Sequence, residues 1–325
     1  MLFNSRILTA IVVLIGVPAV VVGYIALMDW LVSKLPVGMR DRVRPWLWAG
    51  PVIVLLAVYL VYPTINTLYL SFLNYNSTEY VGLKNYIYVF TNSQTLDAMR
   101  NNVYWLVLLT GLTVTFGLLF AVLFDRVRYE SAAKALVFIP MAISFVAASV
   151  IWKLQYDYRP PSAPQTGTLN AAVTSLGGQP VPWLVDPVTN NPALTWVGIW
   201  VWTGFALVIL SAGLKSIPTE ILEAARVDGA NEWQILFQVT IPMMGSTIAV
   251  VATTMVIFAL KAFDIVYVLT NGNFNTDVIA NLMYKQMFNF TDFGRASAIA
   301  TVLLAAIVPV MLFNIRRFRE QEMMR

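Results

Sequence analysis

Long apolar runs alternate with shorter polar connections along this chain. Seven runs are long enough to cross the hydrocarbon core of a bilayer, which takes roughly twenty residues, and they lie near residues 7–28, 47–72, 102–124, 134–155, 194–214, 244–268 and 296–315. The pattern predicts an all-α polytopic membrane protein with about seven transmembrane helices. The first run is also compatible with a secretory signal, because Arg6 precedes it. The basic residues at 34–44 that follow it resist translocation, so we favour a retained span with its N-terminus outside.

Composition supports a membrane protein and narrows its chemistry. Of the 325 residues, 58% are hydrophobic and 12% are charged, whereas a soluble protein has about a quarter charged residues. Cysteine and histidine are both absent, which excludes disulfides, thiol nucleophiles and the commonest general base and metal ligand. We expect no cofactor and no metal site. The net charge of +4 does not imply a nucleic-acid partner, because basic residues in membrane proteins mostly record topology.

The distribution of basic residues predicts how the chain is threaded. Thirteen of the 21 Lys and Arg residues fall in or beside four segments, which are 31–46, 125–133, 215–243 and 316–325. Positively charged loops tend to stay on the cytoplasmic side. We therefore place these four segments, and the C-terminus, inside the cell, and we place residues 73–101 and 156–193 outside.

The most informative polar stretch is Glu220–Pro242, between two apolar runs. Apolar residues in its first half have helical spacing, and Asp228-Gly229 is a turn signal. Asn231 is suited to cap a second helix, with Trp233, Leu236, Phe237 and Ile241 along one stripe until Pro242 stops it. Two short amphipathic helices joined by a bend would form a surface for another protein.

The same stretch resembles a known motif. Glu223-Ala224-Ala225, then Gly229 six residues after the Glu, then Val239, Ile241 and Pro242 are similar to the "EAA" loop in the membrane subunits of bacterial binding-protein-dependent ABC importers. The usual pattern has Ile and Leu where Val239 and Ile241 stand. An ordinary amphipathic loop is the alternative interpretation.

The resemblance implies a function and a set of partners. The chain would be a permease subunit of the bacterial cytoplasmic membrane, with a six-helix core in residues 46–325 and an extra N-terminal helix and basic linker in residues 1–45. Residues 217–242, here called the coupling loop, would dock on a separate ABC ATPase present in two copies. A second similar permease, an extracytoplasmic solute-binding protein and membrane lipid would be the other partners, and nucleic acid would not. The residues implied in ATPase coupling are Glu223, Ala224, Ala225, Asp228, Gly229, Ala230, Phe237 and Pro242.

Two further segments suggest what is carried. Val81–Tyr86 resembles a segment of sugar-type permeases, and residues 259–272 are similar to the end of a span in carbohydrate permeases of the maltose and glycerol-phosphate type. We therefore expect a sugar or oligosaccharide as the substrate. Many prolines in residues 156–193 predict an irregular lobe without helix, which either contacts the binding protein or simply connects two spans.

Candidate residues for a sugar path are polar or aromatic side chains in the spans. For each of them helix packing is the simpler role, so no substrate site is assigned. Lys261 and Asp264 are spaced to pair on one helical face, with substrate contact as the alternative role. The eligible residues are Tyr59, Tyr62, Asn66, Ser144, Ser149, Trp202, Thr203, Thr253 and Thr254.

Missing motifs limit the mechanism. The sequence contains no Gly-x-x-x-x-Gly-Lys-Ser/Thr, so it lacks the loop that cradles nucleotide phosphates. The chain is therefore not expected to be an enzyme, and ATP hydrolysis would occur in a partner. The alternatives are a stand-alone secondary transporter driven by an ion gradient and a membrane scaffold that transports nothing.

Overall fold

The computed structural model describes the backbone of residues 2–323, with side chains described at residue 9 and from 12 to 312. Within these ranges the chain is helical, and the extended pairing is limited to one isolated bridge between Leu73 and Tyr80. The chain forms two compact units, Met1–Asn66 and Thr67–Arg325. The predicted division after residue 45 stays a prediction.

The first unit is a pair of long helices. Helix α1 spans Leu2–Ser33 and α2 spans Val37–Leu56, and a π-helical segment, η1 (Ala57–Val61), joins α2 to α3 (Tyr62–Leu70). Both long helices are apolar enough to cross a membrane. Most of their described apolar side chains are exposed, as expected for helices that face lipid. The outside placement of the N-terminus stays a prediction.

The second unit contains the remaining helices. They are α4 (Lys84–Thr91), α5 (Ser93–Phe124), α6 (Glu130–Phe138), η2 (Ile139–Ala142), α7 (Phe145–Gln155), α8 (Thr168–Ser175), α9 (Asn190–Lys215), α10 (Thr219–Val227), α11 (Glu232–Gln234), η3 (Ile235–Thr240), α12 (Ile241–Met243), α13 (Gly245–Leu260), α14 (Asp264–Leu269), α15 (Ile279–Tyr284), η4 (Lys285–Asn289) and α16 (Phe293–Met323).

The seven predicted spans correspond to helices in the described chain. Five helices are long and apolar enough to cross a membrane, and the number rises to seven if each of two bent helix pairs is one span. One pair, Glu130–Ala142 with Phe145–Gln155, bends by 100°, and the other, Glu232–Met243 with Gly245–Leu260, bends by 70°. The fold is therefore an all-α polytopic arrangement, as predicted.

Two spans are less regular than the apolar pattern predicted. The run 134–155 breaks where Ile143 and Ser144 are extended, and the Ser144 hydroxyl caps α7 by accepting from the amide of Ala147 at 3.1 Å. The run 244–268 is also not one helix, because α13 ends at Leu260 and α14 begins at Asp264. Hydropathy averages over such breaks, since the residues at them are themselves mostly apolar.

Helix α9 is the centre of the second unit. In its most apolar stretch 67% of the residues are buried, against 22% for α5 and 28% for α16. Small residues allow close approach to α9: a Cβ at Gly117 of α5 would lie 2.6 Å from the Cβ of Ala206, and one at Gly204 would lie 2.6 Å from the Cα of Phe138. Packing through small side chains is the usual way that membrane helices associate.

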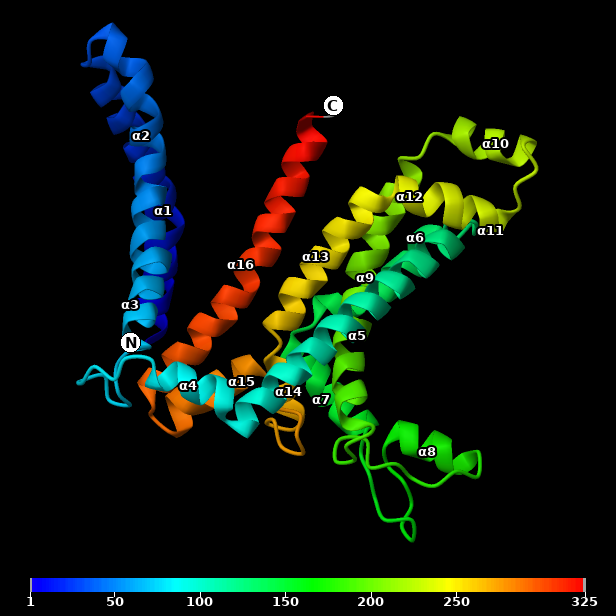
Figure 1. Ribbon diagram of the computed structural model, residues 1–325. Coiled ribbons are helices and arrows are strands. Elements are labelled where there is room, and N and C mark those ends of the chain that lie inside the picture. Colours follow the sequence, from blue (N-terminus) through cyan, green and yellow to red (C-terminus); the bar gives the residue numbers. More distant parts are fainter. Residues whose placement is uncertain (1, 324–325) are drawn as a thin grey trace. The chain divides into compact units, whose positions relative to one another are not determined.

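The two ends of the second unit carry different connections (Figure 1). The coupling loop with α10 and α11, the α5–α6 corner and the C-terminal end of α16 lie at one end. Helices α4, α8, α14 and α15 lie at the other. This separates the loops predicted to be inside from those predicted to be outside. The predicted basic anchor at Arg316–Arg319 falls in α16, outside the residues whose side chains are described.

The connection 156–193 is not the irregular lobe that its prolines predicted. It contains α8, which lies between Pro164 and Pro180 and has no proline of its own. The buried amide of Asn170 organises the connection, because it donates to the carbonyls of Asp157 at 3.0 Å and Val181 at 2.9 Å. The proline count therefore describes the flanks of the connection and not all of it.

Candidate functional site

The first half of the coupling loop is helix α10, and its end is a left-handed turn. The amides of Asp228, Gly229 and Ala230 donate to Ala224, Arg226 and Ala225 carbonyls at 2.9, 3.0 and 3.0 Å. Gly229 has φ +85°, and a Cβ there would meet no atom within 4 Å. The turn therefore favours glycine because of its backbone conformation and not because of crowding. This confirms the turn predicted at Asp228-Gly229.

The second half of the loop starts with a capping box. The Asn231 side chain accepts from the amide of Gln234 at 2.9 Å, and the Gln234 side chain accepts from the amide of Asn231 at 2.8 Å. The predicted cap at Asn231 is thus confirmed. The stop predicted at Pro242 is displaced by one residue, because the helix ends at Met243 and the chain bends by 70° before α13. Pro242 has no backbone N–H to donate, but it comes just after the π-helical turns of η3, where the ordinary helical hydrogen-bond register is already interrupted.

The coupling loop has a buried side and an exposed side. Ile217 and Ile235 are buried, and Leu222 packs against the core around α9. Trp233 and Phe237 are 71% and 58% exposed, and their rings stack with centroids 6.1 Å apart. Trp233 and Phe237 of the predicted stripe thus share an exposed side, and Leu236 and Ile241 are half-buried. Ile235, which is not in the stripe, faces the core. Because η3 is π-helical, the side chains after Gln234 point in different directions from those that a regular α-helix would give them.

The eight residues predicted to act in coupling all lie on this loop, and they are mainly on its surface. Six are exposed and two are half-buried. The exposed ones are Glu223, Ala224, Asp228, Gly229, Phe237 and Pro242, and the half-buried ones are Ala225 and Ala230. The described part of the loop thus exposes a carboxylate, small side chains and the ring of Phe237.

Ion pairs connect the coupling loop to its surroundings. Glu232 pairs with Arg226 at 3.1 Å within the loop and also with Arg126 in the α5–α6 corner. Beside it, Lys215 at the end of α9 pairs with Glu130 at 2.7 Å. Each pair is partly exposed, so water screens it and it adds little stability by itself. Of these pairs, only Arg126–Glu232 joins the loop to the α5–α6 corner, whereas Lys215–Glu130 joins α9 to α6. No local sequence signal predicted these pairs.

A second feature is a cavity of about 200 Å³ inside the helix bundle. Its walls include Trp105, Phe145, Trp202 and Phe258, and the rings of Trp202 and Phe258 have centroids 3.8 Å apart. The indole N–H of Trp105 is buried and has no hydrogen-bond partner among the described atoms. A buried donor without a partner is uncommon in a folded protein. We call this feature the aromatic cavity.

The aromatic cavity corrects one prediction about charged residues. Lys261 and Asp264 both line it, but no ion pair joins them among the described pairs. The helical spacing that would align them does not exist, because Lys261 follows the end of α13 and Asp264 starts α14.

Most residues eligible for a sugar path have structural roles. Of the nine, Trp202 lines the aromatic cavity. The hydroxyls of Ser149, Thr203 and Thr254 donate to carbonyls four residues earlier in their own helices, at 2.7, 2.7 and 2.8 Å. Tyr59, Tyr62 and Asn66 belong to the first unit. Sequence reasoning missed Trp105, Phe145 and Phe258, for which aromatic character within apolar runs was the available signal.

Comparison with known proteins gives consistent matches. The family described as "Binding-protein-dependent transport system inner membrane component" matches residues 89–322. The osmoprotective compounds uptake permease protein GgtC of Synechocystis is 57% identical over 279 residues, which cover 86% of this chain and 100% of the relative. The alpha-glucoside transport system permease protein AglF of Rhizobium meliloti is 44% identical over 299 residues, or 89% of each chain.

A solved structure has the same fold. It is a bacterial ABC transporter involved in the import of the acidic polysaccharide alginate, and one of its chains matches with a TM-score of 0.72 at 24% sequence identity. The match covers 86% of this chain and 98% of that chain. At this identity the match supports the fold alone.

Proposed function

This chain belongs to the family of inner membrane components of binding-protein-dependent transport systems, and from that membership we propose that it is the permease subunit of an ATP-driven sugar importer. The observation that carries the proposal is the accessible coupling loop at one end of a bundle of apolar helices. The chain itself would hydrolyse no ATP, in keeping with its lack of a phosphate-binding sequence motif.

We propose that the coupling loop docks on the ATPase subunit. Trp233 and Phe237 supply exposed apolar area that a partner would bury. Ala224 and Ala225 let the partner backbone come close, and Glu223 is an exposed carboxylate able to pair with a basic residue. The left-handed turn at Gly229 sets the angle between the two loop helices.

The energy for transport would enter through this loop. A conformational equilibrium shifts only when a partner binds its two states with different free energies. Closure of two ATPase subunits on nucleotide would therefore have to favour one position of the loop. The ion pairs of Glu232 with Arg126 and Arg226 would carry the movement of α10 and α11 to α5.

The complete importer would contain further subunits. A second permease would complete the path, and a solute-binding protein outside the membrane would deliver the sugar. The coupling loop and the C-terminus would be cytoplasmic and the N-terminus outside, as the distribution of basic residues favours. The names of two relatives, which refer to osmoprotective compounds and to alpha-glucosides, support a small sugar or sugar derivative as the substrate.

We propose that the sugar passes through the aromatic cavity. Rings such as Trp202 and Phe258 present flat apolar faces to a sugar ring. Lys261 and Asp264 also line the cavity and can hydrogen-bond the hydroxyls of the sugar. The cavity of about 200 Å³ is small for a sugar, so passage would require the helices around it to separate.

Reconstitution of the importer tests the function. The chain, its partner permease and its ATPase are incorporated in proteoliposomes with the binding protein on the outside, and uptake of radiolabelled maltose, sucrose and trehalose is measured. We expect uptake of at least one of these sugars that requires enclosed ATP and binding protein. Uptake driven by an ion gradient, by the chain alone, would favour a stand-alone secondary transporter and refute the proposal.

A further inference from the structure

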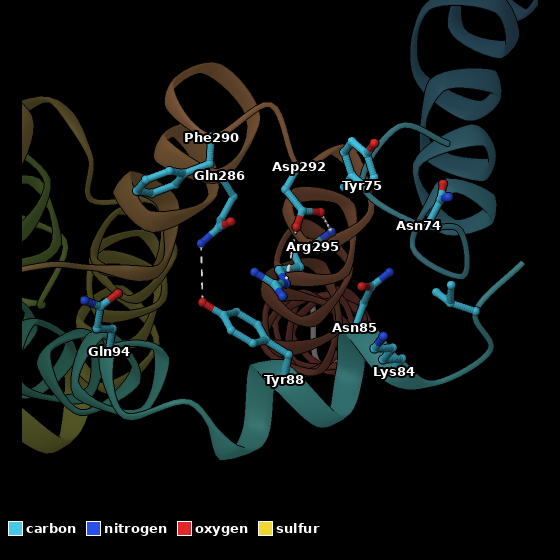
Figure 2. A pocket seen from close by; sticks show the side chains of 11 residues that line it. Asn74, Tyr75, Lys84, Asn85, Tyr88, Gln94, Gln286, Phe290, Asp292 and Arg295 are labelled. Carbon is cyan, nitrogen blue, oxygen red and sulfur yellow. Dashed lines mark hydrogen bonds and ion pairs between the residues drawn. The ribbon is translucent and has the colours of Figure 1, made fainter. Parts of the chain in front are cut away.

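A cleft of about 530 Å³ is lined by residues of the second unit (Figure 2). Helix α4, which forms part of its wall, lies at the end opposite the coupling loop (Figure 1). The walls of the cleft come from the α3–α4 connection, α4, the first turn of α5 and the connection from η4 to α16. We call it the outer cleft. It shares no lining residue with the aromatic cavity, so the two are separate features of the fold. Its volume lies within the 300–1,000 Å³ typical of small-molecule sites.

Buried contacts hold the walls of the outer cleft together. The Asn85 amide donates to the carbonyls of Ser71 at 2.9 Å and Leu73 at 2.7 Å. The amide of Phe293 donates to the carbonyl of Tyr75 at 2.9 Å, and Gly294 packs so closely that a Cβ there would lie 2.3 Å from the Leu73 carbonyl oxygen. These contacts join α16 to the α3–α4 connection, so the cleft is largely pre-formed.

The floor of the cleft carries both donors and acceptors. The Arg295 guanidinium lies 4.1 Å from the centroid of the Tyr88 ring and pairs with Asp292 at 3.3 Å (Figure 2). Gln286 is only 4% exposed, and the side-chain oxygens of Gln286 and Asn85 take part in none of the described hydrogen bonds. They are therefore acceptors left open to a ligand.

Aromatic rings flank these polar groups. Tyr75 is 61% exposed and Phe290 is 64% exposed, and both line the cleft without a ring partner among the described contacts. Exposed rings beside amides and charged planar groups suit a sugar, whose C–H faces stack on aromatics while its hydroxyls both donate and accept. Asp292 offsets the charge of Arg295. Lys84 is then the one charged lining residue without a partner among the described ion pairs, and its ammonium can donate to a sugar hydroxyl.

We propose that the outer cleft binds a neutral pyranoside, such as a glucoside or a disaccharide, before the sugar enters the aromatic cavity. The inference rests on the proposed function only for the direction of transport. Phe290 and Tyr75 would stack on the sugar ring, and Gln286, Asn85 and Lys84 would contact its hydroxyls. The site would retain sugar at the outer surface without the binding protein.

Photolabelling of the assembled importer tests the proposal. The probe is 4-azidophenyl α-D-glucopyranoside, applied to the complex in nanodiscs without binding protein, with 4-azidophenol as the sugar-free control. Mass spectrometry then locates the labelled peptides. We expect label from the glucoside, but not from the phenol, in residues 71–95 or 286–295, and we expect excess maltose to remove it.

Matched variants separate the outer cleft from its surroundings. Phe290→Ala should lower labelling about fivefold, as expected when one aromatic contact is lost. Phe90→Ala removes a ring of similar exposure on α4 that does not line the cleft, and it should leave labelling unchanged. Trp202→Ala, in the aromatic cavity, should also leave it unchanged. Melting temperatures of the complexes show whether each variant is folded.

Three results would overturn the proposal. The first is labelling that excess maltose does not reduce, and the second is labelling that Phe90→Ala and Phe290→Ala lower equally. The third is labelling that appears only when the binding protein is present, which would mark the cleft as a protein contact. ATP-driven uptake is measured on the same preparation, so that failure of the outer site can be distinguished from failure of the proposed function. Uptake without cleft labelling refutes the outer site alone, and labelling without uptake refutes the importer alone.

Discussion

Replacement of Gly229 gives a graded test of the coupling loop. Its φ is +85° and a Cβ added there would have no atom within 4 Å, so the effect of a side chain is conformational and not steric. An L-residue in left-handed backbone costs roughly 1–2 kcal/mol, and Asn tolerates it better than Ala. Since about 1.4 kcal/mol corresponds to tenfold in an equilibrium constant, Gly229→Ala should disfavour the turn about tenfold and Gly229→Asn less.

Gly229→Pro should have the largest effect of the series. Proline is fixed near φ −65° and lacks the N–H that Gly229 donates to the Arg226 carbonyl at 3.0 Å. The turn then cannot form, and the angle between α10 and α11 is lost. Residues 226–229 are all exposed, so insertion and yield of the protein should stay close to those of the unsubstituted chain.

The assay is ATP-dependent sugar uptake and ATP hydrolysis by the reconstituted importer. Uptake should decrease in the order Gly, Asn, Ala, Pro, and Gly229→Pro should transport nothing. Gly111→Ala is the matched control, because Gly111 also has open space around it but lies within α5 with ordinary helical backbone. Full uptake by Gly229→Pro, or lower uptake with Asn than with Ala, would refute the reasoning.

Three other substitutions test separate parts of the structure. Asn231→Ala removes the capping box and should destabilise the second loop helix by about 1 kcal/mol. Hydrogen exchange of the backbone amides at the start of that helix should then be faster, and an unchanged exchange rate would contradict the role of Asn231 as a cap. Gly117→Leu should lower the melting temperature, because its Cβ would lie 2.6 Å from that of Ala206, whereas Gly111→Leu, in open space, should not. Lys285→Met removes the 2.7 Å ion-pair partner of Asp277, while the Asn281 amide still donates to the same carboxylate, so the substitution should destabilise the outer end by about 1–3 kcal/mol. A melting temperature equal to that of the unsubstituted protein would count against it.

Local signals in the sequence predicted much of the fold. Apolar runs located the spans because lipid exposure demands uninterrupted apolar surface. The turn at Gly229 and the cap at Asn231 were predictable because both depend on residues within a few positions of each other. The same holds for the family resemblance, which rests on one short motif.

Features that depend on contacts between distant residues could not be predicted. The break after Leu260, which separates Lys261 from Asp264, lies inside an apolar run. The pairing of Arg126 with Glu232 joins residues 106 positions apart. Helix α8 was missed because the prolines around it concealed a proline-free stretch organised by the buried Asn170. Tertiary contacts decide such features, and hydropathy does not record them.

The outer cleft had the weakest sequence signal. Its residues come from segments about 200 positions apart, such as Tyr88 and Arg295. Each of them is ordinary for an interfacial loop when considered alone. Only their convergence at the start of α16 distinguishes them from scattered polar and aromatic residues.

The most direct test of the central claim is cross-linking from the coupling loop. Because the natural chain has no cysteine, Ala224→Cys introduces a unique attachment point on the exposed side of α10. Phe288→Cys provides an exposed control in η4, which directly follows α15 at the opposite end. A photoactivatable cross-linker at each position is activated in intact cells. The account predicts an adduct between position 224 and an ATP-hydrolysing subunit, and none from position 288. Absence of that adduct, or its equal formation from position 288, would contradict the account.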